Sequence, residues 1–153
     1  AFYLRFAVPD TLDGRFEMVV LHQVLLFHRL GREGETGQDL TQRVFDLFIA
    51  DMDRSLREMG AGDMSVPKKM RKIAESFYGR LAAYGAALQA GDREALAAAI
   101  ARNLFQAEDG TRALPLAAYA LVAMAALSEQ PVDAIARGEL RFQAPDSLMQ
   151  ETT

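Results

Sequence analysis

The sequence contains no cysteine, and only two of its 153 residues are histidine. Without cysteine the chain cannot form a disulfide framework, use a thiol nucleophile, or build a zinc or iron–sulfur site from cysteine ligands. Two histidines alone give little support for haem or zinc binding. We therefore expect no cofactor and no bound metal.

An excess of positive charge is also lacking. The formal net charge is −4 and the pI is near 5.2, so we expect no general attraction to nucleic acid and do not predict DNA as a partner. Any basic patch must be local. Half of the residues are apolar and a quarter are charged, which is ordinary for a soluble globular protein, and the length fits one domain with a real core.

Long, strongly apolar runs are missing as well. The longest run almost free of charge covers residues 113–130 and is rich in alanine. A membrane span needs about 20 strongly apolar residues, so we interpret this run as a packed helix. The chain begins at Ala1 rather than Met, and we expect a native N-terminal segment, with any targeting sequence, to precede it.

Helical periodicity runs through most of the chain, and no strand pattern is visible. Apolar residues recur at i, i+3, i+4 and i+7, with glycine or proline between the segments. The pattern predicts helices over about 15–30, 38–59, 67–90, 93–104 and 115–127, with a short sixth segment over 131–137. Asp13 and Asp92 are the predicted N-caps of the first and fourth helices. The fold prediction is all-α: a single compact bundle of five to six helices over residues 1–145, then a polar, flexible tail over 146–153.

One polar line interrupts the first helix. Arg15, His22 and Arg29 are spaced seven apart and share a narrow arc of an otherwise apolar helix. Asp51 falls inside the apolar arc of the second helix, so we predict that it pairs within the bundle with Arg29 or Arg15. These four residues form the predicted buried polar network, in which His22 is a hydrogen-bonded side chain rather than a ligand or a catalytic base.

Catalytic motifs are absent from the sequence. The carboxylates of Asp51 and Asp53 diverge by about 200° on a helix, which disfavours a shared metal ion. His22 and His28 lack the spacing of bundle metal sites. No nucleophile elbow or phosphate-binding glycine loop occurs. We predict a protein that is not an enzyme, and we keep a helical enzyme of the isoprenoid-synthase type as a weaker alternative.

The clearest feature outside the predicted core is a loop followed by a basic helix start. The loop ends at Val66-Pro67, and four cations occupy the next five residues. A helix N-terminus prefers Asp or Glu in its first turn, so these cations cost stability and indicate an anionic partner. RNA, anionic lipid headgroups or an acidic protein would fit. The predicted partner-binding residues are Asp63, Met64, Val66, Lys68, Lys69, Lys72 and Arg80.

Two stretches carry a family resemblance. VPDTLDGRFEMVVLHQVLLFHRL (8–30) and FDLFIADMDRSLREMGAGDMSVPKKMRKIAESFYGR (45–80) resemble the ubiquinol–cytochrome c chaperone family, assembly factors of the cytochrome b-containing respiratory complex of alphaproteobacteria and mitochondria. The similarity covers about residues 2–142 and is most specific in DMDRSLREMG (51–60) and GDMSVPKKM (62–70). The composition, rich in alanine and arginine, and the lack of eukaryotic extensions are similar to the bacterial branch.

The resemblance implies a non-enzymatic assembly factor. Its mitochondrial members bind newly made cytochrome b, with a small helical partner and near the ribosome exit, until haem is inserted. It therefore implies nascent or apo cytochrome b as the partner, with the ribosome, a small helical protein and the membrane surface as further contacts. The implied location is the cytoplasm, peripheral at the inner membrane of a bacterium, or the matrix side of the mitochondrial inner membrane. The matching motif positions, none of them catalytic, are Asp51, Asp53, Arg57, Glu58, Met59, Gly60, Asp63, Val66, Pro67, Lys68, Lys69 and Met70.

These lines of reasoning meet in one hypothesis. The loop over 60–67 and the first turns of the following helix contact cytochrome b or the membrane surface. Methionine suits such a contact because it is flexible and polarisable; we expect Met64 to be exposed and Met70 to lie in the core. A ribosome- or lipid-binding adaptor that holds no client is the alternative.

Overall fold

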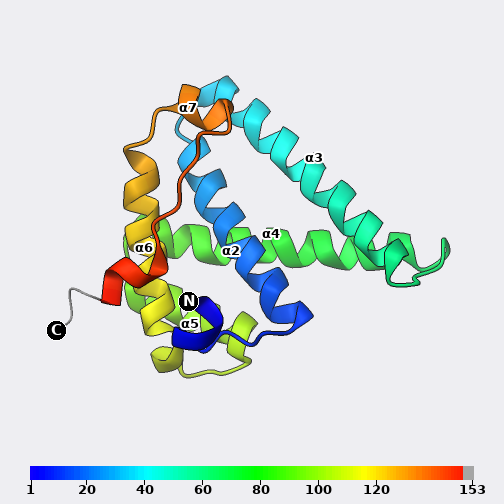
Figure 1. Cartoon of the computed structure of the whole chain (residues 1–153), viewed down its shortest axis with the longest axis horizontal. Helices are drawn as coiled ribbons and strands as arrows, with labels where there is room; N and C mark the ends of the chain where they lie inside the picture. The colour runs from blue at the N-terminus through cyan, green and yellow to red at the C-terminus, as the bar shows by residue number, and fades with distance from the viewer. Residues whose placement is uncertain (150–153) are drawn as a thin grey trace.

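A long antiparallel hairpin of two helices dominates the structure (Figure 1). The computed structural model describes residues 1–149 and contains helices but no strands within them, which confirms the all-α prediction. The five long predicted helices correspond to α2–α6 and the short sixth segment to α7, while α1 is an additional four-residue helix. The elements are α1 (Phe2–Arg5), α2 (Leu12–Leu30), α3 (Gly34–Glu58), α4 (Val66–Ala90), α5 (Arg93–Ile100), a π-helical turn η1 (Ala101–Phe105), a 3-10 turn η2 (Gly110–Ala113), α6 (Leu114–Ser128), α7 (Val132–Ala136) and a 3-10 turn η3 (Pro145–Met149).

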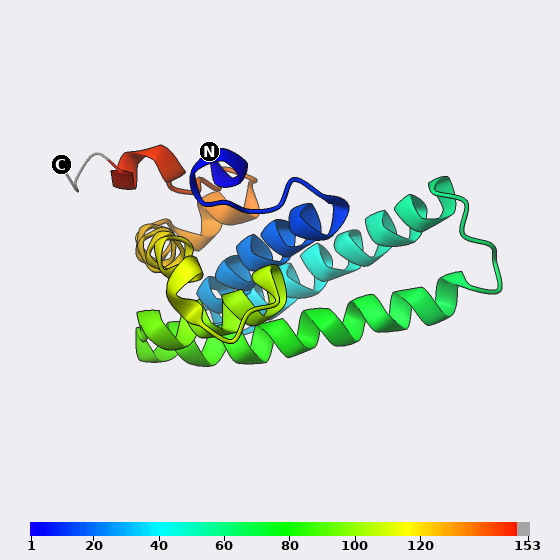
Figure 2. The same ribbon diagram turned by 90° about the horizontal axis from the view of Figure 1, so that it is seen from below.

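The two ends of the described chain lie close together (Figure 2). Arg5 of α1 pairs with Asp146 of η3 at 3.0 Å. The polar tail predicted over 146–153 is therefore described only in its first part, which forms the 3-10 turn η3. The remainder of that prediction, residues 150–153, lies outside the described residues.

Helix capping explains where two helices begin. The hydroxyl of Thr11 accepts a hydrogen bond from the backbone N–H of Gly14 at 3.1 Å, so Thr11 caps α2. The prediction that Asp13 is this cap is wrong; Asp13 lies one residue into the first turn, where a carboxylate still favours the helix dipole. Asp92 caps α5 as predicted, by accepting from the N–H of Ala95 at 2.9 Å.

The connection between α2 and α3 is shorter than predicted. The sequence favoured a loop over 31–37, but α3 already begins at Gly34. Gly37 is buried, and a Cβ atom there would lie 1.9 Å from the carbonyl oxygen of Leu30. The two helices therefore cross closely at this end, and glycine permits the approach.

Helix α2 is the centre of the bundle. It packs against α3, α4 and α6, and Val20, Val24, Leu25 and Leu30 are fully buried along it. A helix that is apolar around most of its circumference requires such surroundings. The apolar pattern of this one helix therefore predicts that it lies at the centre of the core.

Helix α6 completes the core on the other side of α2. Judged by length and composition alone, Gly110–Ser128 is the one helical stretch within residues 1–149 that could cross a membrane. In this structure, 44% of that window is buried. Leu116, Tyr119 and Leu127 are enclosed where α6 packs against α2 and α5, so the helix forms part of the core.

The predicted buried polar network does not form. Arg29 is only 4% exposed and donates to the carbonyl oxygens of Leu127 (3.0 Å) and Gln130 (2.7 Å), which ties the end of α2 to the end of α6. Its remaining nitrogen pairs with Glu33 at 2.6 Å. Arg29 is therefore satisfied by backbone carbonyls and one carboxylate, without Asp51.

The other two charged members of that network lie at the surface. Arg15 is exposed and pairs with Asp10 at 2.9 Å, and Asp51 is exposed and pairs with Arg54 on its own helix. Both predictions are wrong, for different reasons: Asp51 lies in a part of α3 with little packed against it, whereas Arg15 lies on the outward side of α2 although its neighbours Glu17 and Met18 are buried. Only Gly37 and Phe48 are buried along the whole of α3.

A buried ion pair fastens α4 to α2. Arg80 donates two hydrogen bonds to the carboxylate of Glu17, one of them 2.6 Å long, and a third to the carbonyl oxygen of Ser76. The two side chains are only 16% and 9% exposed. Burial by itself lowers the pKa of Arg80, but the hydrogen bonds and charge of Glu17 outweigh it and raise that pKa above its ordinary value.

Arg80, predicted as a partner-binding residue, is consequently directed into the fold and pairs with Glu17 instead of lying exposed with the lysines at the start of α4. The residue is three positions from Phe77, which is fully buried, so it turns toward α2 rather than toward solvent. Glu17 was the available signal, because it is the one carboxylate between Gly14 and Leu30 of the apolar helix α2.

The Glu17–Arg80 pair gives a first testable prediction. Arg80→Met should lower the free energy of unfolding by about 3 kcal/mol, because Glu17 would remain buried without its partner. The double variant Glu17→Leu with Arg80→Met should recover most of that loss, as measured by urea denaturation. Arg54→Met is the control, since its pair with Asp51 is exposed and should contribute about 1 kcal/mol at most. A fully stable Arg80→Met protein would contradict a desolvated pair.

Arg29 and Arg15 give a second, matched prediction. Arg29→Met should cost about 2–3 kcal/mol of stability, because one buried and one part-buried carbonyl group lose their donor. Arg15→Met removes the same side-chain chemistry from the same helix at an exposed site and should change stability by less than about 1 kcal/mol. Equal losses of stability for the two variants in thermal or urea unfolding would contradict the distinction between a buried Arg29 and an exposed Arg15.

Candidate partner-binding groove

The far end of the α3–α4 hairpin projects beyond the rest of the molecule (Figure 2). Gly60 follows α3 with φ +91, a conformation that glycine adopts without strain. Arg57 then holds the loop: it donates to Asp53 on its own helix at 3.0 Å and to Asp63 across the loop. The hydrogen bond to Asp53, followed by the one to Asp63, raises the pKa of Arg57. The end of the hairpin is thus an ordered turn with a cation at its base.

The loop residues predicted to meet a partner fall into two groups. Met64 is 95% exposed and Asp63 is exposed beside it, so both are available for contact. Val66 is 1% exposed, and its assignment to the contact surface is wrong. It lies at the start of α4 on the same face as Ile73 and Phe77, and this i, i+7, i+11 spacing was a signal that it points inward.

The basic start of α4 is exposed as predicted. We call Lys68, Lys69, Arg71 and Lys72 the basic cluster. All four are exposed, and none takes part in an ion pair within the described part of the chain. No acidic residue occupies the first turn, and Ser65 gives no side-chain cap. The cluster contains every lysine in the sequence.

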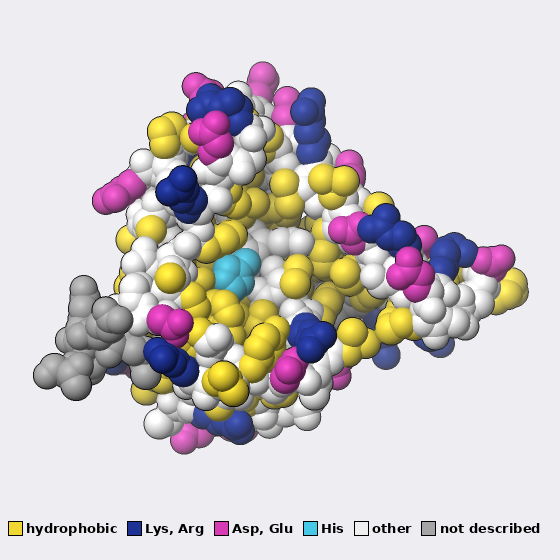
Figure 3. Space-filling view, viewed as in Figure 1, with side chains coloured by type: hydrophobic (Ala, Val, Ile, Leu, Met, Phe, Trp, Pro, Cys, Tyr) yellow, Lys and Arg dark blue, Asp and Glu magenta, His cyan; other side chains and the backbone are white. Residues whose placement is uncertain are grey.

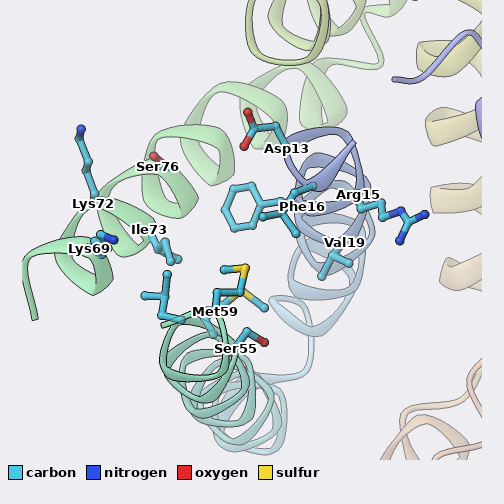
Figure 4. Close-up of a pocket in the computed structure, with 13 residues that line it drawn as sticks. Asp13, Arg15, Phe16, Val19, Ser55, Met59, Lys69, Lys72, Ile73 and Ser76 are labelled. Atoms are coloured by element: carbon cyan, nitrogen blue, oxygen red, sulfur yellow. The ribbon is translucent and has the colours of Figure 1, made fainter. Parts of the chain in front are cut away.

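An apolar groove opens between α2, α3 and α4 just inside the end of the hairpin (Figure 4). Its volume is about 530 Å³. In the close-up, Phe16 of α2 and Ile73 of α4 point toward the space between the helices, with Met59, the residue that follows α3, beside them. We call this the hairpin groove; its lining is Leu12, Asp13, Arg15, Phe16, Val19, Met52, Ser55, Leu56, Met59, Lys69, Lys72, Ile73 and Ser76.

The groove exists because the apolar arc of α3 extends beyond the part of the helix that other helices pack against. Met52 and Leu56 belong to the arc predicted from the sequence, yet both remain partly exposed, and Met59 is mostly exposed. The apolar spacing placed Met52 and Leu56 in the arc that faces the core but did not reveal that the space between this arc and α2 stays open. The basic cluster supplies one rim, since Lys69 and Lys72 line the groove, whereas Arg15 points away from α4 on the other side (Figure 4).

A second hollow lies beside the hairpin groove, around His22 (Figure 3), and shares Arg15 and Val19 of α2 with it. His22 donates from Nδ1 to the carbonyl oxygen of Met18 (2.7 Å), and its Nε2 accepts from the hydroxyl of Tyr119 (2.8 Å). Burial lowers the pKa of His22 and raises that of Tyr119 to about 12, so both are neutral near pH 7. The rings of Phe2 and Phe142 meet the histidine edge-on. His22 therefore joins Phe2 and Phe142 to α2 and is engaged in structural contacts rather than placed as a base.

The acidic pair considered for metal binding is used in ion pairs instead. Asp51 pairs with Arg54 and Asp53 with Arg57, and neither carboxylate lines the hairpin groove. Within residues 1–149 no group of three histidine or acidic side chains is placed to hold a metal ion. The carboxylate-lined cavity that an isoprenoid-synthase-type enzyme requires is not present in this region.

Comparisons with known proteins agree with the resemblance seen in the sequence. The curated proteins that match include the ubiquinol-cytochrome c reductase complex assembly factor 1 of Mus musculus, 28% identical over 145 residues, which are 93% of this chain and 49% of that protein. The Xenopus laevis protein named in the same way is 29% identical over 116 residues, or 75% of this chain and 58% of that one. The chain thus spans about half the length of the mouse relative.

A solved structure and a family model extend the comparison to the fold. The crystal structure of the Cbp3 homolog from Brucella abortus superposes with a TM-score of 0.84 at 46% sequence identity, over 95% of this chain and 81% of that one. The model of the family described as ubiquinol-cytochrome C chaperone matches residues 4–142. This chain belongs to the ubiquinol-cytochrome C chaperone family.

Proposed function

We propose that this chain is a non-enzymatic assembly factor of ubiquinol–cytochrome c reductase that binds newly made cytochrome b in the hairpin groove. Family membership and the names of its curated relatives support a role in assembling that complex. The observation that carries the proposal is the groove itself. It is lined mainly by apolar side chains, has a volume of about 530 Å³, and is open at the end of a helical hairpin.

The groove suits a helical segment of a membrane protein. Such a segment exposes apolar side chains until it is inserted or paired, and an apolar helix face can lie in a groove between other helices. Met52 and Met59 contribute flexible, polarisable walls that adapt to different side chains. Leu12, Val19 and Met59 are exposed around the opening, so a client could cover them without displacing any part of the core.

The rim adds charge selectivity. Lys69 and Lys72 border the groove on the side of α4. Cations at the rim of an apolar site speed association with an acidic partner and disfavour a basic one. A client segment with a carboxylate beside its apolar stretch would match this arrangement. The proposed location is accordingly peripheral, at the membrane into which the client is inserted.

Affinity capture from cells that are translating cytochrome b tests the groove directly. The groove variant carries Leu12→Gln, Val19→Gln and Met59→Gln; the matched control carries Leu4→Gln, Leu47→Gln and Val122→Gln. All six side chains are exposed, and the three control residues do not line the groove. Loss of three apolar contacts should weaken capture of cytochrome b by at least about tenfold in the groove variant and leave the control unchanged. Circular dichroism and the melting temperature verify that both proteins fold.

The outcomes separate client binding from an adaptor role. Equal recovery of cytochrome b with the groove variant and the control would move the client away from the groove. Failure of the wild-type protein to recover it would contradict the proposed client. Recovery of ribosomes or lipid that is independent of the groove and falls steeply with salt would favour the adaptor, because exposed charges are screened.

A further inference from the structure

The end of the hairpin carries several positive charges, and not all of them line the proposed client groove. Residues 57–72, which we call the basic tip, contain five cations and two carboxylates, in a chain whose net charge is −4. One of the two carboxylates, Asp63, is paired with Arg57. Positive charge is therefore concentrated at one end of the molecule, while the remainder is acidic.

Two of these cations have no role in the groove. Lys68 and Arg71 are exposed and do not line it, in contrast to Lys69 and Lys72. In the described part of the chain neither has an acidic partner. Both lie in the first two turns of α4, where the helix dipole opposes them. Their position is unfavourable for folding and requires another explanation.

The apex of the same tip exposes an apolar side chain next to Asp63, whose carboxylate is paired with Arg57. Met64 is almost completely exposed, and Met59 is mostly exposed on the other side of the loop. The hairpin extends past the end of α2 and holds this apex away from the body (Figure 2). Charged side chains of both signs lie along the arm in the space-filling view, and hydrophobic side chains lie at its end (Figure 3).

We propose that the basic tip binds the surface of an anionic lipid bilayer. Met64 inserts at the boundary between headgroups and acyl chains, and the basic cluster contacts the headgroup phosphates. Each lysine or arginine near an anionic surface strengthens binding about fivefold. Because the rest of the chain is acidic, the same field turns the tip toward the membrane and the body away from it. This inference does not rest on cytochrome b as the client.

A lipid surface fits the tip better than RNA does. Residues 57–72 contain no aromatic side chain on which a base could stack. An exposed methionine at the apex adds nothing to phosphate contacts on RNA but gains from entering the bilayer interface. Three of the four cations of the basic cluster are lysines, which act as point charges and suit mobile headgroups, whereas planar arginine suits fixed bidentate contacts.

Vesicle flotation with the full chain tests the charge component. We expect binding to vesicles of phosphatidylcholine with phosphatidylglycerol and none to phosphatidylcholine alone. Lys68→Gln with Arg71→Gln should weaken partitioning about 25-fold. Arg43→Gln with Arg141→Gln is the matched control, because both arginines are exposed and have no ion pair among the described residues. Equal losses in the two variants, or binding to both kinds of vesicle, would overturn the proposal.

The apex is tested with a fluorescent reporter. The sequence has no tryptophan, so Met64→Trp introduces a single indole at the point of insertion, and Leu47→Trp introduces one at an exposed site along α3. Anionic vesicles should shift the emission of the Met64→Trp protein to shorter wavelength and leave that of the Leu47→Trp protein unchanged. An unshifted Met64→Trp spectrum in the presence of bound vesicles would show that the apex does not insert.

RNA is the competing outcome. Purified ribosomes and single-stranded oligouridylate are offered to the same proteins in place of vesicles. If wild-type protein binds either of them and not the anionic vesicles, the lipid proposal is overturned. None of these assays contains the client, and the variants leave the groove lining intact, so a negative result here does not bear on cytochrome b.

Discussion

The organisation of this protein follows from a mismatch in helix length. The central helix α2 has 19 residues, and the two helices of the hairpin have 25 each. At 1.5 Å per residue, α2 covers about 28 Å of a hairpin that is about 37 Å long. Where α2 is present the hairpin is part of a core; where α2 ends, apolar side chains of α3 and α4 remain partly exposed. The hairpin groove lies at the first turns of α2, between that helix and the hairpin, and the basic tip lies beyond the end of α2.

The buried charges lie where α2 packs closely against α4 and α6. Arg80 reaches Glu17 across the interface of α4 and α2, and Arg29 is satisfied by carbonyl groups at the end of α6. An ion pair of this kind is costly to break from one side, so it fixes the register of α4 against α2.

Periodicity predicted the helices well but could not say which part of each helix is covered. The all-α fold and the positions of α2–α6 follow from apolar spacing and from glycine and proline between segments. Asp51 was placed in the core because it shares an arc with apolar neighbours, yet that part of α3 has no helix over it. Arg80 shows the reverse error: it was predicted to contact a partner, but it pairs with a carboxylate of another helix inside the fold. Both errors concern tertiary contacts, which one helix's own pattern does not contain.

For the same reason, only part of the two candidate surfaces could be predicted from the sequence. Met64 and the basic cluster could be found from sequence, because a loop methionine and cations at a helix start need no tertiary partner to be exposed. The groove could not, because its walls come from three helices. Met59, Lys69 and Lys72 belong to both surfaces, so their substitution alone cannot assign a function to either one. Lys68 and Arg71 on the tip, and Leu12 and Val19 in the groove, each belong to one surface only, and the geometry therefore allows the two functions to be separated by experiment.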